Sequence, residues 1–192
     1  MTQIAAIVLA AGSSQRFGDR NKLLATVDGK PVLQHVLKGI EPLDLAKKIV
    51  VVKPGDDEVL SLIDRAVFDI AENHDAENGM GSSIAVGIAA CGNVDAALLI
   101  LGDMPFVQQA TCLQLLAALD DHPDMTVIAP TCEGRRGHPV LFRRQHFADL
   151  RALNTDSGAK PILTSNESTF LAVPTNDPGI LADIDVPADA VS

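Results

Sequence analysis

Short runs of aliphatic residues alternate with segments of helical periodicity along the first two thirds of the chain. The runs cover residues 4–9, 47–52, 67–71, 95–101 and 125–129 and are rich in Val, Ile, Leu and Ala. Strands that are apolar on both faces are typical of parallel sheets covered by helices. Because parallel strands are joined by crossover connections, this alternation predicts a mainly parallel, doubly wound α/β sheet.

The segments between these runs supply the expected helices. Helical spacing of apolar residues, or a capping residue followed by such spacing, predicts helices over 31–40, 56–65, 82–91 and 108–119. The last third breaks this rhythm. It predicts a turn into an extended segment over 134–143, helices near 145–153 and 157–163, a strand over 169–173 and a short helical tail after 181.

Composition limits the kinds of function. A chain of 192 residues without repeats or a linker predicts one domain, and a net charge of −10 disfavours binding of nucleic-acid polymers. A single nucleotide needs only a local cationic cluster and a metal ion. No signal-peptide pattern or membrane-length apolar run is present, and Cys91, Cys112 and Cys132 lack zinc-site spacing. We therefore expect a cytoplasmic protein with reduced thiols and no membrane or nucleic-acid partner.

The first aliphatic run ends in Ala10, Ala11 and Gly12, and two cations, Arg16 and Lys22, follow. Small residues let an anion approach backbone N–H groups closely, so this loop is typical of a phosphate-binding turn. Its spacing matches neither the Walker loop nor the dinucleotide fingerprint. A plain strand-to-helix turn with Arg16 and Lys22 as surface charges is the alternative.

Asp103 follows the run over 95–101, at the sheet edge where the first loop is also expected. A carboxylate there can hold Mg²⁺, which prefers oxygen ligands and bridges to phosphates. The alternative is an ordinary turn residue, since Asp is common in turns. Asp183 and Asp185 are candidates for a second ligand, or they belong to a solvated acidic turn.

A second loop of small residues, 78–83, precedes another expected helix. Gly79 and Gly81 would permit close approach of a base or ribose, and Ser82 and Ser83 offer hydroxyl groups. A simple turn in which Ser82 caps the helix is the alternative.

Among the five histidines, only His138 lies in a cluster of Gly and Arg residues. The others are expected on the surface or, for His35, in a structural position on a helix. No histidine pair has metal-ligand spacing and no G-x-S-x-G motif is present, which disfavours metal-dependent and serine hydrolases.

Six segments in order resemble the molybdenum cofactor cytidylyltransferases, a likeness that covers nearly the whole chain. They are Leu9–Gly12 with Arg16 and Lys22, then 78–83, 101–105, 136–142, 156–160 and 183–187. Ala11, where guanylyl-transferring relatives usually carry Gly, and the Gly-His-Pro segment point to the cytidine branch. Val186 and Ala188 depart from the family ending, and Phe17 replaces a common Met.

The resemblance implies a Rossmann-like nucleotidyltransferase fold similar to GT-A, with a nucleotide-binding part over about 1–105 and an acceptor-binding part over about 106–192. It implies catalytic roles for Lys22, Arg16 and Asp103 and metal ligation by Asp103 and Asp185. The implied nucleotide contacts are Leu9, Ala10, Ala11, Gly12, Arg16, Lys22, Gly79, Ser82 and Ser83. Gly137 and His138 would lie on the acceptor side.

The implied reaction is transfer of CMP from CTP to the terminal phosphate of molybdopterin with release of pyrophosphate. The implied cofactor is Mg²⁺ or Mn²⁺, and the implied partners are CTP, molybdopterin and, transiently, a receiving molybdoenzyme. Two alternatives stay open. One is nucleotidyl transfer with GTP or to another phosphorylated acceptor, such as a sugar or polyol phosphate. The other is a non-catalytic chaperone that delivers molybdenum cofactor.

Overall fold

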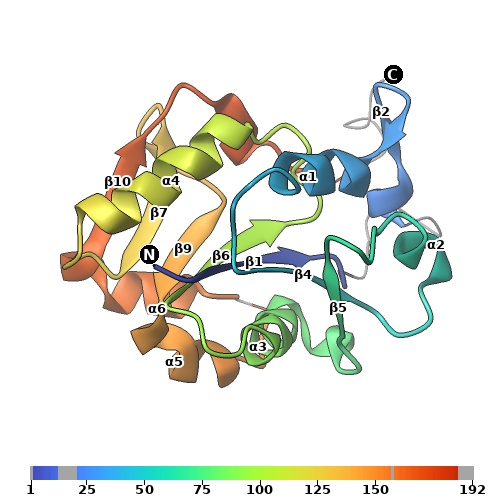
Figure 1. The fold of residues 1–192 in the computed structure, drawn as a ribbon, viewed down its shortest axis with the longest axis horizontal. Coiled ribbons are helices and arrows are strands. Elements are labelled where there is room, and N and C mark those ends of the chain that lie inside the picture. Colours follow the sequence, from blue (N-terminus) through green and yellow to red (C-terminus); the bar gives the residue numbers. More distant parts are fainter. Residues whose placement is uncertain (1, 13–20, 157, 186–192) are drawn as a thin grey trace.

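The computed structural model describes residues 2–12, 21–156 and 158–185. Within them, an eight-stranded sheet has the order β10-β7-β9-β6-β1-β4-β5, with β8 paired to β7 (Figure 1). Its strands are β1 (Ile4–Leu9), β4 (Lys47–Val52), β5 (Asp69–Glu72), β6 (Ala96–Leu101), β7 (Val127–Cys132), β8 (Arg135–Arg136), β9 (Val140–Arg143) and β10 (Phe170–Pro174). A separate hairpin pairs β2 (Thr26–Val27) with β3 (Lys30–Pro31).

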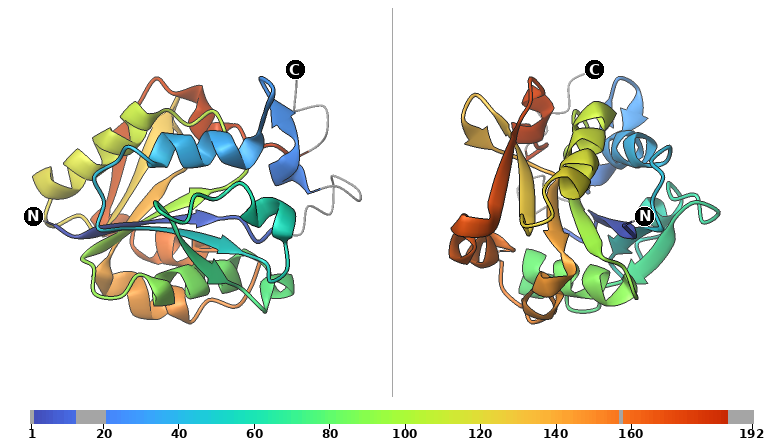
Figure 2. Two further views of the ribbon diagram at one scale, coloured as in Figure 1. Left: turned by 45° about the vertical axis from the view of Figure 1, so that its right-hand side comes forward. Right: turned by 60° about the vertical axis from the view of Figure 1, so that its left-hand side comes forward.

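Helices cover both faces of the sheet and make three layers, which Figure 2 shows from two further sides. The helices are α1 (Val32–Ile40), α2 (Asp57–Leu60), α3 (Met80–Ala90), α4 (Gln109–Asp121), α5 (Phe147–Arg151) and α6 (Lys160–Ser165). Buried residues of α1, α2 and α4 pack on one face. Those of α3, α5 and α6 pack on the other. The alternation of side chains along β1 explains the split, since Ala6 and Val8 face the first layer and Ala5 and Ile7 the second.

The predicted doubly wound, mainly parallel sheet is confirmed. β1 pairs in parallel with both β4 and β6, β4 with β5, and β7 with β10. The segment predicted as extended after residue 134 contains β9, which inserts antiparallel between β6 and β7. The chain leaves β1 toward β4 and β5 and then returns to β6 on the other side, so the topological switch point lies between β1 and β6.

One predicted helix, over 56–65, is shorter than expected. Asp56 caps α2 as predicted, because its side chain accepts a hydrogen bond from the Val59 N–H group. The helix then ends at Leu60, since the Ser61 hydroxyl donates to the Glu58 carbonyl. Asp64 accepts from the Ala66 N–H group and starts a new turn. Short polar side chains that bond to the nearby backbone in this way compete with helix propagation.

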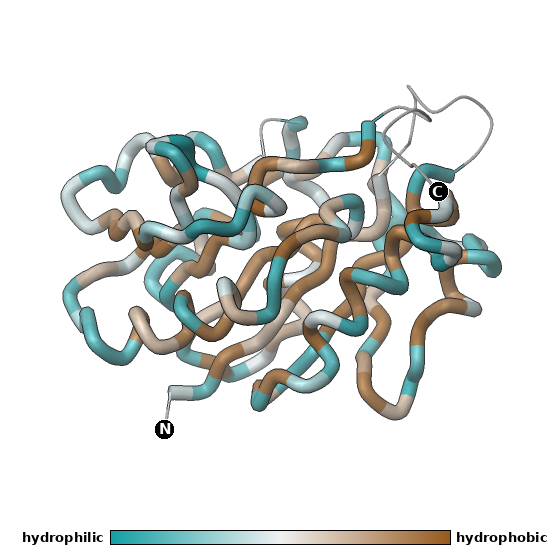
Figure 3. The backbone as a smooth tube through the Cα atoms, turned by 90° about the horizontal axis from the view of Figure 1, so that it is seen from above, coloured by the Kyte–Doolittle hydropathy of each residue, from teal (hydrophilic) through white to brown (hydrophobic). Residues whose placement is uncertain are grey.

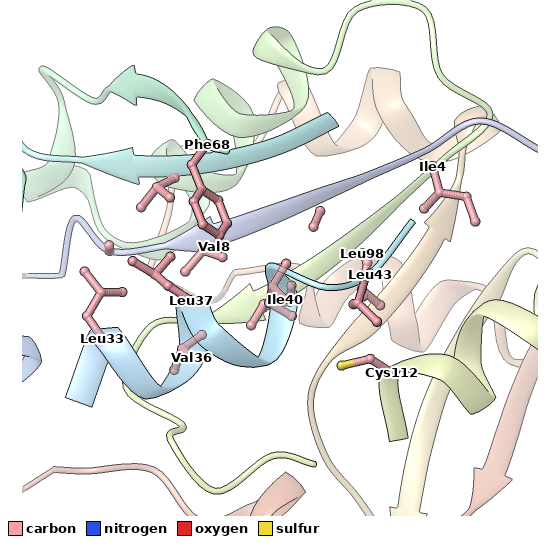
Figure 4. Close-up of a cluster of buried hydrophobic side chains, with 14 of the residues drawn as sticks. Ile4, Val8, Leu33, Val36, Leu37, Ile40, Leu43, Phe68, Leu98 and Cys112 are labelled. Carbon is pink, nitrogen blue, oxygen red and sulfur yellow. The ribbon is translucent and has the colours of Figure 1, made fainter. Parts of the chain in front are cut away.

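The core is aliphatic, as the composition predicts. Figure 4 shows part of one hydrophobic cluster, in which Leu33, Val36 and Leu37 of α1 lie on the same side of the sheet as Val8 and Leu98. In Figure 3 the apolar segments run through the middle of the molecule and polar segments lie around them. Among the described residues, no helix combines the length and the apolar character that a membrane crossing requires.

Two helical glycines allow a matched stability test. A Cβ atom at Gly87 of α3 would collide with Ile7 Cγ2 and lie 3.2 Å from Val51 Cγ2, whereas one at Gly39 of α1 would meet nothing within 4 Å. We expect Gly87→Ala to destabilise the fold by about 1–3 kcal/mol through overpacking. Gly39→Ala should stabilise it by up to about 1 kcal/mol through helix propensity. Urea unfolding of both variants checks this, and equal effects would contradict the packing of α3 on β1.

The three cysteines are buried and form no disulfide, which leads to a second prediction. Burial raises the pKa of Cys91 to about 11 and that of Cys112 to about 12. Thiols of the unfolded chain ionise near their ordinary pKa while these two stay protonated, so the free energy of unfolding should fall as the pH rises above about 9.

Burial also predicts slow chemical labelling of these thiols. At pH 8 we expect Cys91 and Cys112 to react with Ellman's reagent far more slowly in the native than in the urea-unfolded protein. Mass spectrometry of quenched samples checks this, and prompt native labelling of either thiol would contradict it.

Candidate functional site

A pocket opens at the carboxyl ends of β1 and β6, the switch point of the sheet. The residues that line it are Leu9, Ala11, Gly12, Lys22, Leu23, Ala76, Gly79, Met80, Ser83, Leu101, Asp103 and Asp156. They come from the ends of both strands, from two 3₁₀ turns (Lys22–Leu24 and Ala76–Asn78), from the start of α3 and from a loop before α6. In open α/β sheets, ligands bind in the crevice at this position. We call this cavity the switch-point pocket.

Gly102 brings the loops after β1 and β6 together. Its N–H group donates a hydrogen bond of 3.0 Å to the Leu9 carbonyl, and a Cβ atom here would lie 2.8 Å from that oxygen. Only a glycine therefore fits this contact without a shift of the backbone. As a result Asp103, the next residue, lines the same pocket as Gly12.

Lys22 is the cation of the pocket. Its ammonium pairs with Asp103 Oδ2 and lies 3.2 Å from Asp185 Oδ1. Burial by itself lowers the pKa of Lys22, but the hydrogen bonds and charges of Asp103 and Asp185 outweigh this effect and hold the pKa above its ordinary value. Lys22 is therefore charged at neutral pH, at the rim where segments from the start, middle and end of the chain meet.

Local structure holds Lys22 in place. It opens a single 3₁₀ turn over Lys22–Leu24, in which the Asn21 side chain accepts a hydrogen bond of 3.1 Å from the Leu23 N–H group. The Asn21 amide also donates to Asp56, the cap of α2. Leu23 is buried in the core. The hydrogen bonds of Asn21 and the buried side chain of Leu23 thus hold the turn from which Lys22 extends.

Asp183 joins the two carboxylates that pair with this ammonium. Oxygen atoms of Asp103, Asp183 and Asp185 lie within 4.8 Å of one another. Carboxylate oxygens are the ligands that Mg²⁺ and Mn²⁺ prefer, and three clustered anions favour a cation between them. The Lys22 ammonium already supplies one such charge. The donor set therefore fits a hard divalent ion.

The second loop forms the opposite wall of the pocket. Gly79 has φ +92°, and a Cβ atom on it would lie 2.6 Å from the Asp156 Cα atom. Gly81 donates from its N–H group to the Thr155 carbonyl at 2.9 Å. These two glycines thus let the 155–156 loop pack directly on the start of α3.

The two serines of this loop have different environments. Ser83 lines the pocket, whereas Ser82 is not among its lining residues. The Ser82 hydroxyl donates to the Gly79 carbonyl, and the buried Asn73 amide donates to both serine hydroxyls at 2.9 Å. Gly79, not Ser82, occupies the N-cap position of α3, so the alternative in which Ser82 caps the helix is wrong.

A second cavity adjoins the first and shares Leu9, Met80, Leu101 and Asp156 with it. Its other lining residues are Ile84, Leu99, Arg136, Gly137, His138, Val140, Phe142, Gly158, Ala159, Lys160 and Leu163. Apolar side chains of the sheet and of α3 form much of its lining, together with the cations Arg136 and Lys160. We call it the adjoining cavity.

Gly137 and His138 enter this cavity from the segment before β9. A Cβ atom at Gly137 would collide with the Ile180 carbonyl, which also accepts a 3.0 Å hydrogen bond from the His138 N–H group. Burial lowers the pKa of His138, with Asp103 opposing and Arg136 reinforcing the effect. Its Nδ1 atom is buried and has no hydrogen-bond partner among the described residues. His138 is therefore a neutral polar group at neutral pH.

The structure brings most of the predicted site residues together. Leu9, Ala11, Gly12, Lys22, Gly79, Ser83 and Asp103 line one pocket, and Gly137 and His138 line its neighbour. Ala10 belongs to the core instead, where its N–H group donates to the Val51 carbonyl. Arg16 lies outside the described residues. Asp156 lines both cavities and Lys160 lines the adjoining one, although their motif by itself indicates no role. The available signal was their position at the start of a helix of the last third, since Asp156 precedes α6 and Lys160 is its first residue.

The fold and the site define a class of protein: a doubly wound α/β domain with a pocket at its switch point, lined by Lys22 and Asp103, in the usual place for a nucleotide. A family model described as the MobA-like NTP transferase domain matches residues 6–169. The chain belongs to this family.

Similar proteins agree with this assignment. A homologue of Rv0371c from Mycobacterium sp. strain JC1 has a TM-score of 0.85 at 25% identity, covering 97% of this chain and 92% of that one. Rv0371c of Mycobacterium tuberculosis H37Rv gives 0.82 at 28% identity, with coverage of 98% and 95%, and another of its crystal structures is a complex with manganese. The bifunctional protein GlmU of Sphingopyxis alaskensis is 37% identical over 132 residues, which are 66% of this chain but 28% of that protein. The chain thus spans less than a third of that relative.

Proposed function

We propose that this chain is a nucleotidyltransferase that transfers CMP from CTP to the terminal phosphate of molybdopterin and releases pyrophosphate. One observation carries the proposal: the Lys22–Asp103–Asp185 ionic cluster is built at the switch-point pocket, which adjoins a second cavity lined by His138. Transfer between two substrates needs two adjacent sites with a charged group near the reacting phosphates. The resemblance to cytidylyltransferases supplies the identity of the substrates.

We assign CTP to the switch-point pocket. Gly12 and Ala11 offer a backbone that a phosphate can approach closely, and Gly79 and Ser83 face them from the start of α3. By resemblance, Arg16 joins Lys22 in holding the triphosphate. On this assignment residues 1–105 bind the nucleotide and residues 106–192 bind the acceptor in the adjoining cavity.

Asp103 and Asp185 would hold Mg²⁺ or Mn²⁺, with Asp183 as a third donor. A crystal structure of the similar protein Rv0371c as a complex with manganese supports this choice. When bound, such an ion neutralises charge on the α-phosphoryl group and on the leaving pyrophosphate.

The residues of the chain orient and neutralise rather than react. The acceptor phosphate is itself the nucleophile: its oxygen attacks the α-phosphorus of CTP in line, the bond to the β-phosphate oxygen breaks, and pyrophosphate leaves. Lys22 stabilises the negative charge that develops, since its ammonium is preorganised by two carboxylates. Neutral His138 offers a hydrogen-bonding group to the acceptor.

The test is pyrophosphate release from CTP by the purified chain with Mg²⁺ and molybdopterin. We expect release that requires both molybdopterin and the metal and that exceeds release with GTP. Parallel reactions with sugar phosphates and polyol phosphates test the broader acceptor class. Pyrophosphate release with one of these acceptors but not with molybdopterin would overturn the assignment of the acceptor, whereas the assignment as a nucleotidyltransferase would stand.

A delivery role is the competing proposal. If the chain bound molybdenum cofactor tightly but released no pyrophosphate from any nucleotide, the enzyme proposal would be wrong and the function would be that of a non-catalytic chaperone. If the enzyme is confirmed, we place its reaction in the cytoplasm, with transient transfer of the product to a molybdoenzyme. Co-purification of the product with such an enzyme checks that step.

A further inference from the structure

The segment over residues 177–185, which we call the C-terminal strap, follows β10 and contacts both parts of the site. Asp177 at its start accepts hydrogen bonds from Gln108, the N-cap residue of α4, and from Thr111 in the first turn of that helix. Ile180 in its middle accepts from the His138 N–H group at 3.0 Å, and Ile184 near its end donates to the Asp103 carbonyl at 2.9 Å. The strap therefore connects the adjoining cavity to the acidic cluster.

Ile184 is the apolar anchor at the end of the strap. Its side chain is 1% exposed and packs with Val27 and Val32 in a small hydrophobic cluster of its own. Alternate side chains of an extended chain point to opposite sides. Accordingly the neighbours of Ile184, Asp183 and Asp185, are directed at Asp103 while Ile184 is directed into the hydrophobic cluster.

We infer that Ile184 is a positioning residue for the metal site: its contact with Val27 and Val32 holds Asp183 and Asp185 beside Asp103. This inference rests on the proposed metal-binding function. Three carboxylates so close together repel one another, and the single Lys22 ammonium, which pairs with Asp103 and Asp185, balances only part of their charge, so a further contact must oppose their separation. The Ile184 side chain does so by burial in a hydrophobic cluster, and its N–H group ties the strap to the Asp103 backbone.

The contact also links the strap to Lys22. Val27 lies in the hairpin that follows the Lys22 turn, and the Val32 N–H group donates to the Ala25 carbonyl at 2.8 Å and closes that hairpin. The His35 ring bonds to the Val27 carbonyl at 2.7 Å and holds the hairpin on α1. The anchor of the carboxylates is therefore part of the same rigid unit that carries the ammonium.

The first experiment measures Mn²⁺ binding to the full chain by electron paramagnetic resonance of the free ion. We expect Ile184→Ala to weaken Mn²⁺ binding about tenfold or more, in the range that supporting residues of metal sites show. Ile184→Val should restore binding to near the wild-type value. Ile40→Ala removes a comparable buried side chain from the main core and should not change Mn²⁺ affinity. Unchanged binding by Ile184→Ala would overturn the inference.

The second experiment needs no metal. Amide hydrogen exchange of the strap should be slow in the wild type and in Ile40→Ala and fast in Ile184→Ala. Fast exchange in the wild type, or slow exchange in Ile184→Ala, would refute the anchoring role whether or not Mn²⁺ binds. If the wild type binds no Mn²⁺ but shows the expected exchange pattern, the metal assignment of the proposed function fails while the anchoring of the strap stands.

Discussion

Asp103→Ala is expected to lower metal-dependent turnover on the order of 10²–10³-fold, the cost of losing one preorganised charged group at a reacting centre. Asp103 is the carboxylate that pairs with Lys22 and belongs to the acidic cluster. Its loss therefore removes a metal donor and one of the carboxylates that hold the Lys22 ammonium. Initial rates of pyrophosphate release at saturating CTP check this, with Mn²⁺ titration as a second measurement.

Asp124→Ala is the matched control for this variant. Asp124 is exposed in the turn before β7, at the opposite edge of the sheet from the site. Its removal changes the net charge by the same amount and should leave turnover unchanged. Lys22→Met should show a loss similar to that of Asp103→Ala. Full Mg²⁺-dependent turnover by Asp103→Ala would refute the metal assignment.

Asp177→Ala is expected to destabilise the fold by about 3 kcal/mol, because buried donors lose a charged acceptor. Asp177 is 2% exposed. One of its oxygens accepts from the Gln108 N–H group at 2.8 Å and from the Thr111 hydroxyl at 2.7 Å, and the other accepts from the Gly179 N–H group at 3.0 Å. It therefore acts as the cap that the α4 sequence lacks, because Gln108 makes no side-chain cap bond.

Urea unfolding of Asp177→Ala and Asp177→Asn measures this effect. The asparagine variant keeps one acceptor oxygen and should lose less stability than the alanine variant. A loss below about 0.5 kcal/mol for Asp177→Ala, the range of ordinary surface substitutions, would contradict the capping role.

The local sequence was sufficient to predict the central strands. The aliphatic runs over 4–9, 47–52 and 95–101 all form buried strands, because only a sheet covered on both faces buries such segments. The position of Asp103 after one of them placed it correctly at the edge that Gly12 shares. The extended segment that contains β9 was predicted, but its antiparallel pairing with β6 and β7 was not, since that pairing depends on distant segments.

Two residues of the predicted motifs, Ala10 and Ser82, do not line the switch-point pocket. Ala10 and Ser82 stand beside pocket residues in sequence, yet Ala10 packs in the core and Ser82 bonds within its own loop. A difference of one residue turns a side chain to another side of a strand or helix, so a motif cannot specify which of its members faces a ligand. Asp156 is the opposite case: its sequence motif indicated no role, yet it lines the pocket because its loop packs closely on Gly79.

By itself the sequence determined the class of fold and the segments that carry charge and small residues, because periodicity and strand composition are local properties. Tertiary structure alone decided that Lys22, Asp103 and Asp185 share one ionic cluster and that Asp177 caps a helix far from it in sequence. These arrangements depend on contacts between segments that only the packed sheet and the C-terminal strap bring within hydrogen-bonding distance.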